Sequence, residues 1–446
     1  MVRVAGLLIV VSAALAGCST TEVKIAHAVP LVSATEAIPE AQLLDVGVVT
    51  FDPGVPDGEI DKEVLEELLR DGTFVQIRRT ESMYMAVELR DTLQKSGNWG
   101  AVWVTPEEST AADLNVVTQI LQSDGWIARL HVKATDATGR VWIDDDYELE
   151  TAAGAFNRQR YPDLDPYQDV YNEIANDLAA AAEQLSGKQK AEVRTVGQLR
   201  YASELSPESF DGYVEENRSG IYEPVRLPAT DDPMFARTQS VRQRERLFFD
   251  TLDQHYEKFS AEAESAYDSW RQYAREEAIA VRDLTRQSRF RTAMGAATIF
   301  ASLLYGKESG SNSFSERVVR DAIMYVGTDL LRSSQVRRQE RRLHAETLQE
   351  LSESFDDEVE PLVVDVAGTE HRLTGTAEAQ YAEWRDLLQQ LFISETGFAP
   401  ESLEFRTEPL DEPATGASVE EPAVPNAEPA AKEVSSDASG GTANGA

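Results

Sequence analysis

Large side chains recur every three or four residues along one stretch of this chain, and charged residues fill most positions between them. The recurring residues are Phe248, Leu252, His255 or Tyr256, Phe259, Ala263, Ala266, Trp270 and Tyr273. This spacing predicts a long amphipathic helix of the coiled-coil kind. Such a helix is stable mainly through the packing of its apolar stripe, so the chain must supply a partner for it.

The partner expected from the sequence is a second helix. Residues 293–305 are almost uncharged, residues 306–313 are rich in Gly and Ser, and a second amphipathic stretch runs from Phe314 to Phe355. Two helices joined by a short polar loop form an antiparallel hairpin, which we expect across residues 234–356. Residues 357–398 predict a small strand pair followed by a last helix, Ala377–Phe392, packed on the hairpin base.

The tip of this hairpin is the candidate partner-binding site. Its small and apolar residues are Ala293, Ala297, Phe300, Ala301 and Leu304 on the first arm, and Val326 and Leu330 on the return arm. Small residues allow close approach of helices, and arginines flank the apolar stretch on both arms. One interpretation is a docking end for a protein, a membrane surface or a second copy. The other is an ordinary helix seam whose arginines pair with nearby glutamates.

The segment before the hairpin predicts an α/β domain over residues 40–187. A buried strand at 43–51 precedes a helix at 79–95, four further strands at 99–104, 115–121, 126–134 and 140–150, and a helix at 167–185. Residues 188–233 contain Pro207, Pro224, Pro228 and Pro233 and predict a connector. The expected fold class is therefore α+β, with a small α/β sandwich-like domain followed by the helical hairpin.

The N-terminus carries a targeting signal. Arg3 precedes an apolar stretch from Val4 to Leu15, and Cys18, the single cysteine of the 446 residues, ends the run Leu15-Ala16-Gly17-Cys18. A charged start, a short apolar core and small residues at the cut are typical of a secretory signal peptide, here residues 1–17. The apolar core is too short to span a bilayer. One interpretation is a plain signal peptide in which the cysteine occurs by chance.

The other interpretation is a lipid anchor, because the tetrapeptide that ends in Cys18 resembles the lipobox of bacterial lipoproteins. The resemblance implies cleavage between Gly17 and Cys18, diacylglycerol on the Cys18 sulfur and acylation of the new amino group. Several acyl chains give stable membrane anchoring. Ser19 stands where an Asp commonly retains such proteins at the inner membrane, which implies an outer-membrane lipoprotein that faces the periplasm. Residues 18–39 are polar and unpatterned and predict a flexible lipidated tether.

Three patterns in the α/β segment carry a second resemblance. They are the strand Asp45–Phe51, the helix that ends in Leu93-Gln94-Lys95-Ser96-Gly97, and the pair Leu130–Asp136 with Gly139–Trp142. Together they are similar to the small α/β domain of the TolB N-terminal region, the curli secretion lipoprotein and the outer-membrane activators of penicillin-binding proteins. The resemblance implies a fold and a cell-envelope setting. The chain lacks the long membrane-inserting hairpin pattern of a secretion pore.

The net charge of −36 excludes nucleic acid as a partner, because the phosphate backbone would be repelled. Acidic residues, Pro and Ala dominate residues 399–446, which predict a disordered acidic tail. The tail either binds a basic partner or only keeps the protein solvated.

The chain contains no common catalytic motif, so we expect no catalytic, cofactor-binding or metal site. None of its five histidines lies three or four residues from another, as a helical zinc pair requires. Asp144 and Asp146 would share one face of a strand, where a solvated edge is the simpler interpretation than a metal site.

The sequence therefore predicts a non-enzymatic scaffold or adaptor in a cell-envelope assembly. Its partners would be membrane lipid through acylated Cys18, and a protein or a second copy through the hairpin. Two alternatives remain open at this point. One is a periplasmic cell-wall enzyme or ligand binder with a polar pocket near the strand ends, and the other is a ring-forming secretion component.

Overall fold

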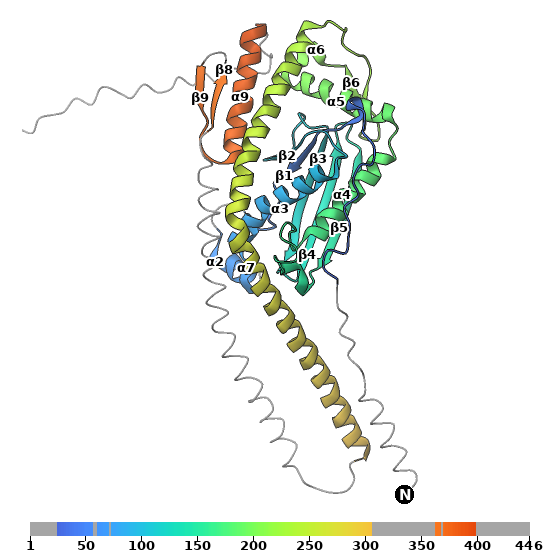
Figure 1. Cartoon of the computed structure of the whole chain (residues 1–446), viewed down its shortest axis with the longest axis vertical. Helices are drawn as coiled ribbons and strands as arrows, with labels where there is room; N and C mark the ends of the chain where they lie inside the picture. Colours follow the sequence, from blue (N-terminus) through green and yellow to red (C-terminus); the bar gives the residue numbers. More distant parts are fainter. Residues whose placement is uncertain (1–24, 57–59, 71–72, 306–361, 367–368, 398–446) are drawn as a thin grey trace, which may run out of the picture. The chain divides into compact units, whose positions relative to one another are not determined.

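A five-stranded mixed sheet forms the centre of the fold. The computed structural model describes residues 25–56, 60–70, 73–305, 362–366 and 369–397. The strand order is β2-β1-β3-β4-β5 (Figure 1). β1 (Val46–Val49) pairs in parallel with β2 (Val102–Thr105) and β3 (Leu114–Ser123), and β3, β4 (Ile127–Asp136) and β5 (Val141–Glu150) form an antiparallel meander. This confirms the predicted strands and the α+β class.

Helices α3 (Val75–Ser96) and α4 (Gln168–Glu183) pack side by side and against the sheet, and the short α2 (Lys62–Arg70) precedes α3. α3 ends at Gly97, whose φ of +68° suits a residue without a side chain. The sequence predicted this stop and placed the helix start four residues late.

A single helix, α7 (Pro233–Tyr305), packs along α3 and along the edge strand β2. Most of the positions that the spacing selected are buried, including Phe248, Leu252, Phe259 and Trp270. The first arm of the predicted hairpin is thus a helix. The described partners of its apolar stripe are α3, β2 and α9 (Ala377–Thr396). The return arm lies outside the described residues, so the coiled-coil-like hairpin stays a prediction. Periodicity identifies a buried face without identifying what buries it.

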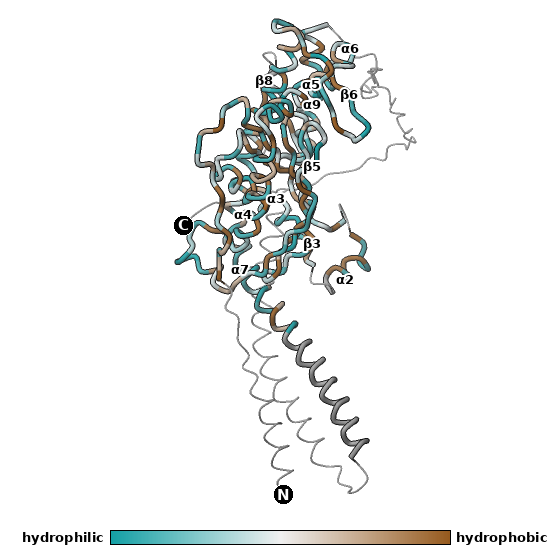
Figure 2. Tube along the Cα trace, turned by 90° about the vertical axis from the view of Figure 1, so that its right-hand side faces the viewer, coloured by the Kyte–Doolittle hydropathy of each residue, from teal (hydrophilic) through white to brown (hydrophobic). Residues whose placement is uncertain are grey.

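The predicted helix at the end of the chain is present as α9, and it packs on α7 as expected. Phe248 of α7 stacks on Trp384 of α9 with ring centroids 5.6 Å apart. The strand pair before it is β8 (Val363–Val366) and β9 (Thr369–Arg372), which pair antiparallel. The buried apolar residues of the sheet, α3, α4, α7 and α9 form one continuous hydrophobic core. In Figure 2 the hydrophilic stretches of the trace lie mainly at loops and outer turns.

Residues 188–233 are more ordered than the predicted connector. They hold α5 (Gly187–Leu205), the short α6 (Pro207–Phe210) and the hairpin of β6 (Val214–Glu216) and β7 (Tyr222–Pro224). Ser186 caps α5 through a reciprocal capping box with Gln189. The first proline of this segment is Pro207, which follows the end of α5, so the prolines do not interrupt this helix.

The predicted flexible tether is also wrong for its second half. From Ile25 onward the chain is described, and residues 28–34 are hydrogen-bonded to α4 and to the end of α3. The sequence of residues 18–39 is polar and unpatterned, so it did not indicate that polar side chains of α4 bind this segment. The signal segment with Gly17 and Cys18, the return arm of the hairpin and the tail beyond residue 398 lie outside the described residues. Among the described helices, none is long and apolar enough to cross a membrane.

Candidate functional site

A row of polar residues on α7 fastens this helix to the body of the protein. We call this row the α7 seam, and its members are Arg242, Glu245, Arg246, Asp250, Asp253, Tyr267 and Arg271. Arg242 and Arg271 are about 44 Å apart along the helix at 1.5 Å per residue. The seam runs beside the apolar stripe, so each polar group must find a partner in the body.

The C-terminal end of the seam is a buried ion pair. The guanidinium of Arg271 donates from Nη1 to Asp165 Oδ1 at 2.9 Å and from Nη2 to Asp165 Oδ2 at 2.6 Å. Both side chains are essentially inaccessible to solvent. Asp268 accepts a further hydrogen bond from Nη2. This is the bidentate fork geometry that Arg provides and Lys does not.

Three tyrosine rings surround the Arg271 guanidinium. Its carbon lies 4.0 Å from the ring centroid of Tyr267, 4.9 Å from that of Tyr167 and 5.4 Å from that of Tyr84. Burial by itself raises the pKa of Asp165, but the charge and hydrogen bonds of Arg271, together with the Tyr167 amide and Arg158, outweigh burial and hold this pKa below its ordinary value. The pair is therefore ionised at neutral pH, and the tyrosine faces add cation–π attraction.

The turn between β3 and β4 lies directly against α7 at this point. Gly125 has a φ of +76°, and a Cβ atom there would overlap the backbone oxygen of Arg271. The amide of Gly125 donates to the Tyr167 hydroxyl at 3.0 Å. Glu81 accepts from Tyr267 and Ser123 nearby, and burial raises the pKa of Glu81. The Arg271 cluster therefore joins α7, α3, α4 and the hairpin turn.

The middle of the seam contacts β2 through its backbone. Asp253 accepts a hydrogen bond from the Val104 amide at 3.0 Å and pairs with Arg90 of α3 at 3.1 Å. Burial outweighs the attraction of Arg90 and raises the pKa of Asp253 to about 6. One turn away, Asp250 accepts from the indole nitrogen of Trp103. The edge of the sheet is covered at these residues by polar side chains of a helix.

The N-terminal end of the seam buries a carboxylate that is held by hydroxyl groups. Glu245 accepts hydrogen bonds from Ser109 at 2.9 Å, from Tyr201 of α5 at 2.7 Å and from Tyr381 of α9 at 2.5 Å. Burial, with the Glu245 charge adding to it, raises the pKa of both tyrosines, so both remain donors at neutral pH. Close by, Arg242 pairs with buried Asp113 at 2.9 Å.

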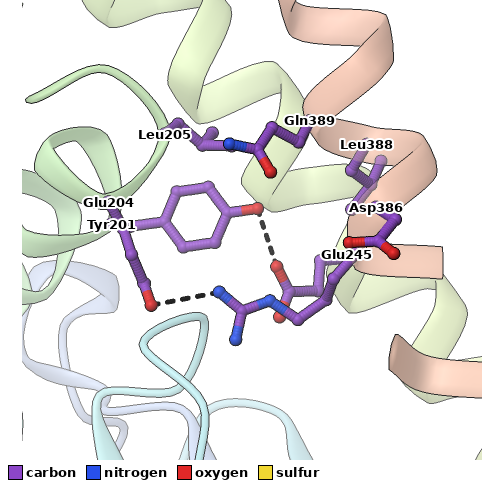
Figure 3. Close-up of a pocket in the computed structure, with 8 residues that line it drawn as sticks. Tyr201, Glu204, Leu205, Glu245, Asp386, Leu388 and Gln389 are labelled. Carbon is purple, nitrogen blue, oxygen red and sulfur yellow. Dashed lines mark hydrogen bonds and ion pairs between the residues drawn. The ribbon is translucent and has the colours of Figure 1, made fainter. Parts of the chain in front are cut away.

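A small polar cavity of about 180 Å³ opens beside Glu245, between α5, α7 and α9. Its other lining residues are Tyr201, Glu204, Leu205, Arg385, Asp386, Leu388 and Gln389. Figure 3 shows the hydroxyl of Tyr201 pointing at Glu245. Arg385 pairs with Glu204 at 3.0 Å, so two of the charges that line the cavity partner each other. The cavity is smaller than the roughly 300–1,000 Å³ of drug-sized ligand pockets.

This cavity is not at the strand ends, where the ligand-binder alternative placed its pocket. Asp144 and Asp146 of β5 instead flank His131 of β4, whose ring nitrogens lie 3.3 Å and 2.8 Å from the two carboxylates. All three side chains are exposed. In the part of the chain that the structure describes, no group of three or more acidic, His or Cys side chains is arranged to hold a metal ion.

The tip residues selected from the sequence are placed in part. The backbone of Ala293, Ala297, Phe300, Ala301 and Leu304 belongs to the last turns of α7. Val326 and Leu330 lie outside the described residues, as do Gly17 and Cys18. Sequence reasoning missed the α7 seam. A usable signal was present, because Arg271 follows Trp270 and lies one turn from Tyr267 in an otherwise apolar stripe.

No protein-family model and no curated protein matches this chain. The site must therefore be interpreted from its own geometry.

Proposed function

We propose that this chain is a lipid-anchored, periplasm-facing outer-membrane lipoprotein that acts as a scaffold or adaptor in a cell-envelope assembly. One observation carries the adaptor part. α7 is a single helix of 73 residues whose N-terminal part is fixed to the body through the α7 seam and whose backbone continues to Tyr305. Arg282, over the ring of Trp126, still contacts the body. From Arg282 to Tyr305 the helix rises by about 35 Å.

The buried charges of the seam support a role in holding the helix direction. A buried ion pair gains little net stability, because the desolvation of both ions offsets their attraction. It does penalise any arrangement in which the two charges are separated. With pairs at Arg242, Arg246, Asp253 and Arg271, α7 is fixed to the body at several points. A helix fixed in this way holds a protein bound at its far end in a defined orientation relative to the body.

The composition of the far end of α7 supports the choice of partner. Residues 293–305 combine small residues with Phe300 and Leu304 and contain no charged residue. A helix with such a surface binds another helix closely through its small residues. The partner we propose is a protein helix, from another envelope protein or from a second copy of this chain, seated at Ala293–Leu304 and at the predicted return residues Val326 and Leu330.

Site-specific photo-crosslinking in intact cells tests the adaptor role. A photoreactive residue at Phe300 should give a discrete crosslinked product. Leu247 is the matched control, because it lies on the same helix, is apolar and is 55% exposed on the part held by the body. Crosslinks of equal yield at both positions, or no product at Phe300, would count against the adaptor role.

Deletion of residues 293–331 gives a second test of the same proposal. Partner capture in a pull-down should be lost, while the body keeps its circular dichroism and its resistance to protease, because the described core residues lie before Arg282 and from Leu362 onward. Capture of the same partners by the deletion variant would contradict the adaptor proposal.

The anchor is tested separately. Cys18→Ala should abolish labelling of the protein by radioactive palmitate and release it from the outer-membrane fraction. Ser19→Ala keeps the thiol and serves as the control. Palmitate labelling of the Cys18→Ala variant would overturn the anchor while leaving the adaptor role open.

A further inference from the structure

Three polar side chains on one face of α4 form a ladder that grips the N-terminal segment. They are Asp169, Asn172 and Asn176, spaced by three and four residues, which places them one above another on the helix. The segment that they grip is residues 28–34, which we call the strap. The strap lies just before the η1 turn (Glu40–Gln42) and β1.

The lower part of the ladder binds the start of the strap. Asp169 accepts hydrogen bonds from the amides of Ala28 and Val29, at 2.9 Å and 3.1 Å. The side-chain amide of Asn172 donates to the carbonyl oxygen of Val29 at 2.8 Å. One carboxylate and one amide thus satisfy three polar groups of the strap backbone at Ala28 and Val29.

The upper part of the ladder repeats this pattern. Asn176 accepts from the amide of Val32 at 2.8 Å and donates to the carbonyl oxygen of Pro30 at 3.0 Å. The side-chain amide of Asn176 has both an acceptor and a donor. It therefore pairs with an N–H and a C=O of the strap, as the backbone of a neighbouring β-strand would. Past the ladder, the amide of Ala34 donates to the Ser96 carbonyl oxygen at the end of α3.

These contacts engage the strap backbone rather than its side chains. Val32 is 53% exposed and Ile25, just before the strap, is 78% exposed. The hydrogen bonds of Asn176 are themselves exposed to solvent. Exposed backbone hydrogen bonds with little apolar burial mark segments that open locally at low free-energy cost. The apolar anchoring of the strap comes from Leu31, which is partly buried against the core, so it is much smaller than that of α7.

The residue just before the strap has a strained backbone. His27 has a φ of +54°, and among the described residues it is the one non-glycine with positive φ. Its ring packs edge-on against Tyr161 with centroids 4.5 Å apart. A non-glycine residue in this left-handed region is strained, because its Cβ crowds the following carbonyl oxygen, and this strain favours release of the strap once the ladder bonds open.

We propose that the ladder of Asp169, Asn172 and Asn176 is a latch that binds residues 28–34 of its own chain and sets how far the body stands from the anchor. The reach part of this proposal rests on the lipid anchor at Cys18. With the strap bound, nine residues link Cys18 to His27, and they span at most about 30 Å. With the strap released, the link extends to Glu40, whose carbonyl oxygen is held by Arg194, and 22 residues span at most about 70 Å.

The latch itself is tested by hydrogen exchange on the full-length protein in detergent, which requires no anchor. In Asn176→Ala we expect the amides of Val29, Val32 and Ala34 to exchange at least tenfold faster than in the wild type, with β4 unchanged. Glu173→Ala, an exposed position on the same helix, is the matched control and should leave strap exchange unchanged. Val32→Pro removes the amide that donates to Asn176 and leaves α4 unchanged. If Asn176→Ala disturbs the helix itself, Val32→Pro still tests the latch.

Equal exchange of the Val29 and Ala34 amides, which all three proteins retain, in the wild type, Asn176→Ala and Val32→Pro would overturn the latch. The reach is then measured by energy transfer from a dye on the body to labelled lipid, with protein anchored in vesicles. Release should lengthen the distance in both strap variants and not in Glu173→Ala. An unchanged distance despite faster exchange overturns the reach role. Failure of every variant, wild type included, to bind vesicles would refute the anchor and leave the exchange result standing.

Discussion

The two ends of the α7 seam bury charge in different ways. At Arg271 a cation and an anion are buried together, in a bidentate pair enclosed by tyrosine rings. At Glu245 a carboxylate is buried with three hydroxyl donors from three separate elements. The first arrangement depends on one strong partner, and the second divides the same task among several weaker ones. The Arg271 end should therefore tolerate the loss of a partner much less well.

The largest effect is expected for Arg271→Met. This variant leaves Asp165 buried with hydrogen bonds from the hydroxyl of Tyr84 and the amide of Tyr167 but without its cation. Loss of one partner of a buried pair costs about 3–5 kcal/mol, measurable by urea denaturation. The double variant Arg271→Met/Asp165→Asn should recover part of this loss. A destabilisation under about 1 kcal/mol would show that water reaches Asp165.

Gly125→Ala should be the next most damaging change. The new Cβ would overlap the Arg271 carbonyl oxygen, so the turn must move away from α7. We expect a loss of about 3 kcal/mol from backbone strain and displacement together. Gly212→Ala is the control, because Gly212 has a similar φ of +72° and nothing within 4 Å of its Cβ position. It should lose about 1 kcal/mol, and equal losses in thermal unfolding would refute the close-approach argument.

The middle of the seam should respond to pH through Asp253. Burial raises its pKa to about 6, above the ordinary value of 3.8. The folded state thus favours the protonated carboxyl, and the stability that this group contributes is fully present below about pH 3.8 and lost as pH rises through about 6. The stability of Asp253→Asn relative to the wild type should increase by about 2 kcal/mol between pH 4 and pH 7. Urea titrations at four pH values measure this difference, and a constant difference would contradict the raised pKa.

The smallest effect is expected at the Glu245 end. Tyr381→Phe removes one of three hydroxyl donors and leaves Glu245 with Ser109 and Tyr201. A loss of about 1 kcal/mol is expected in urea denaturation. Tyr201→Phe provides the parallel measurement from α5. A loss as large as that of Arg271→Met would mean that the three donors do not share the charge.

The sequence identified most of the secondary structure, because periodicity and turn residues are local. The five strands, α3, α4, α7 and α9 follow from apolar spacing and from stops such as Ser96-Gly97. α5 was missed although Val193, Val196 and Leu199 repeat at helical spacing and are buried. Its other positions are mostly polar, and Gly197 and the prolines that follow obscured the pattern.

The seam and the ladder could not be derived in the same way. Asp165 and Arg271 are separated by 106 residues, and Val32 and Asn176 by 144. Any of the many acidic residues could have paired with Arg271 as far as the sequence shows. Only the packing of α7 against the sheet selects Asp165.

By itself the sequence determined the strands, most of the helices and the presence of one very long helix, since each depends on neighbouring residues. The targeting signal before Cys18 is a prediction of the same local kind. The tertiary structure decided what the long helix packs against, which buried charges meet, and that residues 28–34 lie on α4 rather than extend as a free tether. These outcomes depend on groups distant in sequence, and a buried charge or backbone amide takes its partner from whatever the fold brings within hydrogen-bonding distance.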